Sequence, residues 1–251
     1  MRIVRIIALA CLVLALFVSA SGCSKSGKVL KVGSDCTYPP MEYQEGDEFK
    51  GFDIDLIGAI GEELGREIEI VNTGWDGIIP GLKNGNYDAL ISAMTITDER
   101  KAEINFSDPY FVAGQVILVR AENTEIASEN DLAGKTVAVQ MGTTGDISVT
   151  KIKGVKIKRF NTNPEAVQEL RNGGCDAVVG DSTTLMWEAT KDARLKLVSS
   201  KPFTSEFYGI GVKKGNDKLL NQINKALAKL KKDGKYAEIY KSWFGVEPPE
   251  E

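Results

Sequence analysis

The stretch GLKNGNYDALISA (Gly81 to Ala93) has a second copy, ELRNGGCDAVVGD (Glu169 to Asp181), at an offset of 88 residues. Both copies place a leucine, a basic residue, Asn-Gly and Asp-Ala at equal positions, and an apolar pair follows in each. Each copy is typical of a helix end, a glycine that stops the helix and a buried strand. Although a common motif can repeat by chance, this one predicts two units of like α/β design.

The residues around each copy alternate β-rich and helical segments. In the first expected helix, Phe52, Leu56, Ile60 and Leu64 recur at helical spacing, and Gly65 stands where a C-terminal cap belongs. Strands that alternate with helices predict an α/β fold with mainly parallel sheets. The elements expected in and beside the first unit are strands at 29–34, 67–72 and 87–92 and helices at 52–65 and 75–85, and a basic segment at 151–159 is expected as an edge strand.

Two apolar, glycine-bearing segments, residues 114–120 and 207–214, flank the second unit and are expected to cross between the units. The helical tail that follows, broken at Gly234, should return to pack on the first unit. We therefore expect a two-lobe α/β fold, in which each lobe is a mainly parallel sheet flanked by helices and two hinge strands join the lobes. The expected boundaries are 28–118 with 208–251 for lobe 1, and 119–207 for lobe 2.

Residues 1–22 are typical of a secretory signal peptide. Two arginines precede an apolar run, Ile6 to Val18, that is too short to span a bilayer. The run leads to Ala20-Ser21-Gly22-Cys23, which is similar to a bacterial lipobox, in which the cysteine is acylated. We expect a lipid on Cys23 and a polar tether at residues 23–27. The alternative is plain cleavage, with Cys23 an incidental thiol.

The composition excludes several classes of protein. A formal net charge of −4, without a solvated basic block, argues against nucleic acid as a partner. The chain has no histidine, which removes Ser-His-Asp and Cys-His catalysis and histidine-ligated zinc. Cys36 and Cys175 fall in different lobes and are expected to remain separate thiols. We expect no cofactor and no metal.

In an open α/β sheet, ligands bind beyond the carboxyl ends of the strands, so two such lobes should enclose a cleft. Thr97 is expected to cap a short helix and so to place Arg100 at the third helical position. Ala93 and Asp181 hold matching places in the repeat, and both should face the cleft. An α-amino acid needs a guanidinium for its carboxylate and a carboxylate for its ammonium, because either charge is costly to bury unpaired. The other polar or aromatic residues just past strand ends are Asp35, Tyr38, Thr95, Gln140, Thr143 and Thr144.

Several segments resemble the extracytoplasmic amino-acid-binding proteins that feed ABC importers, in the branch for polar amino acids. The most specific is TITDER followed in register by FSDPY, within residues 95–110. The resemblance covers nearly all of residues 28–245. It implies two lobes that close on the ligand, an ABC permease as partner, a lipid anchor as the one attachment to the membrane, and a monomer. Supporting segments are GSDCTYPPMEY, GFDIDL, GWDGIIPGL, VAVQMGTTGD, DAVVGD and DGKYAEIYKSWFG.

Residue by residue, the resemblance implies that Arg100 binds the α-carboxylate of the ligand, together with the backbone amides of Thr95 and Thr144. Asp181 would bind the α-ammonium, with the carbonyl of Ala93 and the hydroxyl of Thr95 completing the shell. Four residues would contact the ligand side chain: Tyr38 and Trp75 as a sandwich, and Asp35 and Gln140 at its far end.

Each role has a simpler alternative. Arg100 could be a solvated helix charge, Asp181 a turn residue, and Asp35 only a cap of the turn after it, while Tyr38 and Trp75 could be core aromatics. Asp35 is not needed to neutralise the main chain of the ligand. Together with the rings of Tyr38 and Trp75, it favours arginine as the ligand, with lysine or histidine as lesser ligands. Glutamine is the rival, because its amide could pair with the same acid. A dehydratase-like enzyme and a sensor domain are further alternatives, and we expect a binding protein rather than an enzyme.

Overall fold

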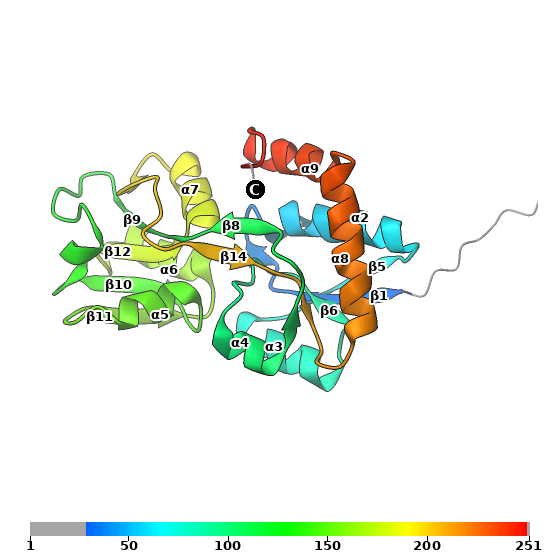
Figure 1. Cartoon of the computed structure of the whole chain (residues 1–251). Coiled ribbons are helices and arrows are strands. Elements are labelled where there is room, and N and C mark those ends of the chain that lie inside the picture. The colour runs from blue at the N-terminus through cyan, green and yellow to red at the C-terminus, as the bar shows by residue number, and fades with distance from the viewer. Residues whose placement is uncertain (1–28, 250–251) are drawn as a thin grey trace, which may run out of the picture.

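The computed structural model describes residues 29–249, which form two lobes, each built on a five-stranded sheet (Figure 1). In each sheet four strands run in one direction and one runs against them. The predicted α/β fold with mainly parallel sheets is thus confirmed. The order in lobe 1 is β5 (Ile68–Asn72), β1 (Leu30–Ser34), β6 (Ala89–Leu90), β15 (Gly211–Val212), β7 (Asn105–Phe106). The order in lobe 2 is β11 (Lys156–Phe160), β10 (Thr136–Gln140), β12 (Ala177–Asp181), β9 (Gln115–Arg120), β13 (Leu195–Leu197).

The sequence repeat is also a repeat of contacts. The carboxylate of Asp88, just before β6, accepts a hydrogen bond from the backbone N–H of Lys31 at 3.1 Å. Asp176, just before β12, accepts the same bond from Thr136 at 2.8 Å. Because each aspartate joins its strand to the neighbouring parallel strand, the matching sequence positions do the same structural work in both lobes.

Lobe 1 is covered by the helices that the sequence predicted. Gly65 ends α2 (Phe52–Leu64) in the left-handed conformation, as expected of a C-terminal cap. The tail helices α8 (Asp217–Lys232) and α9 (Lys235–Phe244) return to this lobe and pack on α2. The other helices of the lobe are α3 (Trp75–Asn84) and α4 (Asp98–Glu103), and a small sheet holds β2 (Thr37–Tyr38), β3 (Glu42–Glu45) and β4 (Glu48–Lys50).

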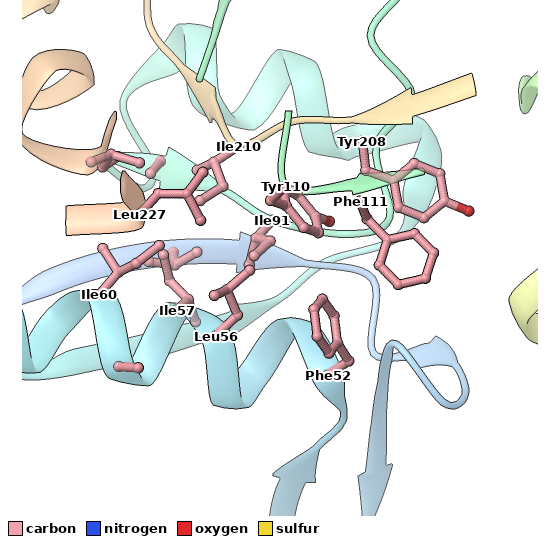
Figure 2. Close-up of a cluster of buried hydrophobic side chains, with 14 of the residues drawn as sticks. Phe52, Leu56, Ile57, Ile60, Ile91, Tyr110, Phe111, Tyr208, Ile210 and Leu227 are labelled. Carbon is pink, nitrogen blue, oxygen red and sulfur yellow. The ribbon is translucent and has the colours of Figure 1, made fainter. Parts of the chain in front are cut away.

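The core of lobe 1 joins segments that are far apart in the sequence. Figure 2 shows Phe52, Leu56, Ile57 and Ile60 of α2 on one face of this cluster, opposite Ile91, Tyr110, Phe111, Tyr208, Ile210 and Leu227. Phe52 is fully buried, and its ring contacts those of Tyr110, Phe111, Tyr236, Tyr240 and Phe244.

The edge strand predicted in lobe 2 at residues 151–159 is present but begins later. Residues 151–155 form a turn after the preceding helix, and β11 at the edge of the sheet is Lys156–Phe160. Its helices are α5 (Thr144–Thr150), α6 (Asn163–Arg171) and α7 (Ser182–Lys191), with a 3₁₀ turn, η1 (Glu129–Leu132). Cys175 is buried in this lobe and Cys36 in the other, and both are free thiols, as expected.

The connecting strands lie earlier in the chain than predicted. β8 (Phe111–Ala113) and β14 (Glu206–Tyr208) pair with each other and run side by side between the lobes (Figure 1). The segment expected to cross, residues 114–120, instead forms β9 inside the second sheet, and 207–214 leads into β15 of the first. The prediction failed because an apolar run is typical of a strand buried on both faces of a sheet, and the connecting strands are not buried on both faces. The true connecting strands each carry an exposed residue, Val112 at 53% and Phe207 at 47%.

The strand predicted at residues 87–92 is also shorter than expected, since β6 ends at Leu90. Three residues later Ala93 has a φ of 43°, which turns the chain out of the sheet. The signal peptide, Cys23 and the tether lie outside the described residues. None of the helices between residues 29 and 249 combines the length and the apolar composition needed to cross a membrane.

Replacing Phe52 with alanine should lower the free energy of unfolding by about 3–5 kcal/mol, because it leaves a cavity among the surrounding rings. Urea unfolding followed by circular dichroism measures the change. Ile147, 42% exposed on α5, is the matched control, and its alanine variant should stay within about 0.5 kcal/mol of the wild type. Equal losses in the two variants would contradict the assignment of this core.

Candidate functional site

A pocket between the lobes is lined by every residue that the sequence analysis assigned to a ligand. Its empty space is about 290 Å³, part of it open to solvent, so the pocket is too narrow for a peptide. The nine residues are Asp35, Tyr38, Trp75, Ala93, Thr95, Arg100, Gln140, Thr144 and Asp181. Glu42, Ser92 and Thr143 complete the lining.

Arg100 is turned into the pocket rather than toward water. Helix α4 begins after Thr97, whose hydroxyl accepts a hydrogen bond from the backbone N–H of Arg100 at 3.2 Å, as predicted for an N-cap. The guanidinium donates to the carbonyl oxygens of Thr95 at 2.8 Å and Gly142 at 3.4 Å. Its central carbon lies 5.1 Å from the centroid of the Trp75 ring. Arg100 is only 8% exposed, and its partners are neutral, so the site can still accept an anion.

Asp181 faces the same pocket from the other lobe, at the end of β12. Its Oδ1 accepts from Nε2 of Gln115 at 2.5 Å, and its Oδ2 accepts from the hydroxyl of Tyr208 at 2.6 Å. Burial, and then the nearby Glu206 carboxylate, raise the pKa of Asp181 to about 6. Burial lowers the pKa of Arg100, and the charge of Asp181 is the largest effect that opposes this. Opposite charges from opposite lobes therefore face one small cavity.

Glu206, on β14, is a component that the sequence analysis missed. Its Oε2 accepts from the hydroxyl of Thr95 at 2.8 Å and from that of Thr144 at 2.7 Å. Its Oε1 accepts from the hydroxyl of Thr204 at 2.8 Å. One buried carboxylate on a connecting strand thus joins a hydroxyl from each lobe. No pattern marks this residue, because a single glutamate in a short strand is usually solvated.

Asp35 and Gln140 meet across the pocket. Nε2 of Gln140 donates to Oδ2 of Asp35 at 3.1 Å, and the hydroxyl of Thr37 donates to Oδ1 of Asp35 at 2.9 Å. Asp35 therefore caps the following turn and also faces the pocket, so the two interpretations of this residue are compatible. Burial raises the pKa of Asp35, and the Asp76 carboxylate adds to that effect.

The remaining residues of the pocket take different positions. Tyr38 belongs both to the core of lobe 1 and to the pocket lining, whereas Trp75 is half-buried against Arg100. The backbone N–H of Ala93, in its left-handed conformation, donates to Oδ2 of Asp53 at 2.7 Å. That carboxylate holds a conformation that an alanine rarely adopts.

The signals that could have found the missed residues are weak. Gln115 is a polar residue at the start of an otherwise apolar strand, and it is fully buried. Ser92 sits at the end of a predicted strand, beside a residue that was assigned to the site. Among residues 29–249, no cluster of three or more side chains could hold a metal ion.

Two α/β lobes that enclose a small pocket between facing charges define a two-lobe solute-binding protein. The chain belongs to the bacterial extracellular solute-binding proteins, family 3, whose model matches residues 30–246. The predicted resemblance to amino-acid-binding proteins of ABC importers is confirmed.

Individual relatives and solved structures agree with this family assignment. A probable histidine-binding protein of Neisseria gonorrhoeae is 38% identical, with 96% of this chain and 94% of that protein covered. An ancestral arginine-binding protein, solved bound to arginine and also bound to glutamine, is 46% identical with a TM-score of 0.83 in both structures. The alignment covers 86% of this chain for the arginine complex and 87% for the glutamine complex, and 98% of each structure. The arginine-, lysine-, histidine-binding protein ArtJ of Geobacillus stearothermophilus is 41% identical with a TM-score of 0.83, covering 88% of this chain and 97% of that structure.

The raised pKa of Asp181 predicts how the stability of the unliganded protein depends on pH. A carboxyl group whose folded pKa is raised contributes stability that is fully present below its ordinary pKa of 3.8 and is lost as the pH rises through about 6. The free energy of unfolding should fall by roughly 2–3 kcal/mol through this group between those pH values. Urea titrations across this range should show a flatter profile for Asp181→Asn. Asp108→Asn, at an exposed position, is the control and should keep the wild-type profile. Parallel profiles for wild type and Asp181→Asn would contradict the raised pKa of Asp181.

Proposed function

We propose that this protein captures an L-amino acid with a basic side chain, arginine above the others, and delivers it to an ABC permease. Capture of an amino acid for ABC import is what the family and the relatives support. The choice of a basic ligand rests on one observation: the pocket holds more acid than a simple amino acid can neutralise. Arg100 and Asp181 match the two charges of the backbone, and Asp35 then remains for the side chain.

The main-chain groups of the ligand are assigned to the residues that lack charged partners. Arg100 donates only to backbone carbonyls, so the ligand carboxylate can occupy its free N–H donors, with the amides of Thr95 and Thr144 nearby. Asp181 accepts only from neutral donors, so the ligand ammonium can supply its counter-charge, with the Ala93 carbonyl as a further acceptor.

The side chain of the ligand is assigned to the other end of the pocket. Tyr38 and Trp75 also line the pocket, with Trp75 beside Arg100, and a guanidinium is the cation best suited to stack on such rings. Its N–H groups would replace the bond that Gln140 makes to Asp35. Lysine and histidine fit the same charge with fewer matched donors. An acidic side chain does not fit, because Asp35 would repel it.

Hinge closure is the mechanism that this arrangement supports. Contacts across the pocket come from both lobes: Gln140 to Asp35, Arg100 to the carbonyl of Gly142, and two threonine hydroxyls to Glu206. A ligand that bridges Arg100 and Asp181 adds two charge-assisted contacts to the closed form alone, and so shifts the population toward closure. The permease would recognise the closed shape. We infer that the protein acts as a monomer, and the lipid anchor at Cys23 stays a prediction from the sequence.

Glutamine is the second candidate, because the ancestral relative binds both amino acids. Its side-chain amide could donate to Asp35 and accept from Gln140. A dehydratase-like reaction is the remote candidate. It would need a spare acid in the pocket, for which Asp35 and Glu42 are the available groups. The relatives named above are binding proteins, which supports a function without catalysis.

Replacing Arg100 with alanine should weaken arginine binding by about 3 kcal/mol or more, since it leaves the ligand carboxylate buried without a counter-charge. Isothermal titration calorimetry gives the affinity. Lys101, the exposed next residue of α4, is the control, and its alanine variant should bind like the wild type. A loss of less than about threefold for Arg100→Ala would remove this residue from the site.

A calorimetric screen of the twenty amino acids should find arginine as the tightest ligand. Asp35→Asn should then weaken arginine binding at least about tenfold and affect glutamine much less, because only the cation loses a counter-charge. Tight binding of glutamine with no binding of arginine would overturn the basic-ligand proposal and leave the amino-acid site itself in place.

A further inference from the structure

Two carboxyl groups, those of Glu42 and Asp53, lie within hydrogen-bonding reach of each other beside the pocket. Glu42 begins β3 and lines the pocket, and Asp53 stands in the first turn of α2. Glu42 is 1% exposed and Asp53 is 0% exposed. Between residues 29 and 249, no lysine or arginine forms an ion pair with either group. Two ionised carboxylates in such a place would repel each other with no basic side chain to compensate.

The hydrogen-bond donors around the pair leave one place unfilled. Oε1 of Glu42 accepts from the hydroxyl of Ser92 at 2.9 Å. Oδ2 of Asp53 accepts from the backbone N–H of Ala93 at 2.7 Å and from the hydroxyl of Tyr110 at 2.8 Å. The remaining oxygens, Oε2 of Glu42 and Oδ1 of Asp53, are fully buried and receive no hydrogen from a permanent donor. A single proton between the two carboxyl groups satisfies both.

We propose that Glu42 and Asp53 share one proton at neutral pH, with Glu42 as the acid and Asp53 as the carboxylate, and that the pair positions Asp35 and Ala93 in the ligand pocket. The proton belongs on Glu42 because Asp53 has two donors that stabilise its negative charge, Ala93 and Tyr110, whereas Glu42 has one.

Each carboxyl group leads to one pocket residue. The hydroxyl of Ser92 donates to Glu42 and so keeps a lone pair for the backbone N–H of Asp35, which donates to it at 3.0 Å. Asp53 holds the N–H of Ala93, the one non-glycine residue with positive φ in the described chain. Glu42 and Asp53 are therefore positioning residues, because they act on the ligand through Asp35 and Ala93.

The surroundings of the pair favour retention of the proton. Burial is the main cause that raises the pKa of Glu42 well above its ordinary value and the pKa of Asp53 to about 6. The charge of Asp35 also raises the pKa of Glu42. The other titratable groups that face the pair are Cys36 after β1, Tyr38 on β2 and Tyr110 before β8, and none of these can supply a positive charge.

Infrared spectroscopy of the unliganded protein tests the proton directly. Near neutral pH the wild type should show the C=O stretch of a buried protonated carboxyl group. Glu42→Gln should lose this band and still fold, because the glutamine amide donates to Asp53 in place of the proton. Glu48→Gln, an exposed residue of β4, is the control and should keep the band.

A wild-type protein without the band, or a Glu42→Gln variant that keeps it, would overturn the shared proton. Because the wild-type spectrum alone can decide against the proposal, the test does not depend on how well the variants fold. It also does not depend on which ligand binds.

The positioning role rests on the proposed function and is tested with L-arginine as the probe. Glu42→Ala removes the acceptor of Ser92 and should weaken arginine binding at least tenfold in calorimetry. Glu42→Gln, which keeps an acceptor for Ser92 and a donor for Asp53, should recover most of that loss. Equal binding by wild type and Glu42→Ala would overturn the positioning role. Failure of the wild type to bind arginine would overturn the proposed ligand and leave the infrared result unaffected.

Discussion

The pocket depends on two buried charges of opposite sign that have no charged partner of their own. Arg100 donates to carbonyl oxygens and Asp181 accepts from an amide and a phenol, and within residues 29–249 neither forms an ion pair. Buried charges are expensive unless they are paired, so the unliganded protein carries this cost in both lobes. In the proposed function, a zwitterion would relieve both costs together, and only while the lobes face each other. This is the physical basis of the proposed link between binding and closure.

The connecting strands contact the pocket through few groups. β8 and β14 form a two-stranded ribbon, and β14 places Glu206 and Tyr208 at the pocket edge. Tyr208 stacks in the core of lobe 1 (Figure 2), and its hydroxyl donates a hydrogen bond to Asp181 of lobe 2. The rest of each lobe is a conventional sheet with packed helices. The carboxyl groups that line the pocket, those of Asp35, Glu42 and Asp181, lie at this boundary between the lobes.

Much of the fold could be predicted from the sequence, because local rules govern it. Helix spacing and the glycine at its end located α2, the repeat located two similar lobes, and the threonine cap located Arg100 at the start of α4. The connecting strands could not be located in this way. An apolar run shows that a segment is buried and not which sheet buries it, so the sequence predicts a crossover where the structure has β9.

The sequence by itself determined the two-lobe architecture, the family, and the nine residues that meet in one pocket, because strand ends, helix caps and a specific motif are local features. Only the tertiary structure decided what those residues contact. It brought Gln140 to Asp35, Glu206 to the hydroxyls of both lobes, and Glu42 to Asp53. Such contacts join residues that are distant in the chain, and burial changes the energy of a carboxyl group by amounts that no local pattern encodes.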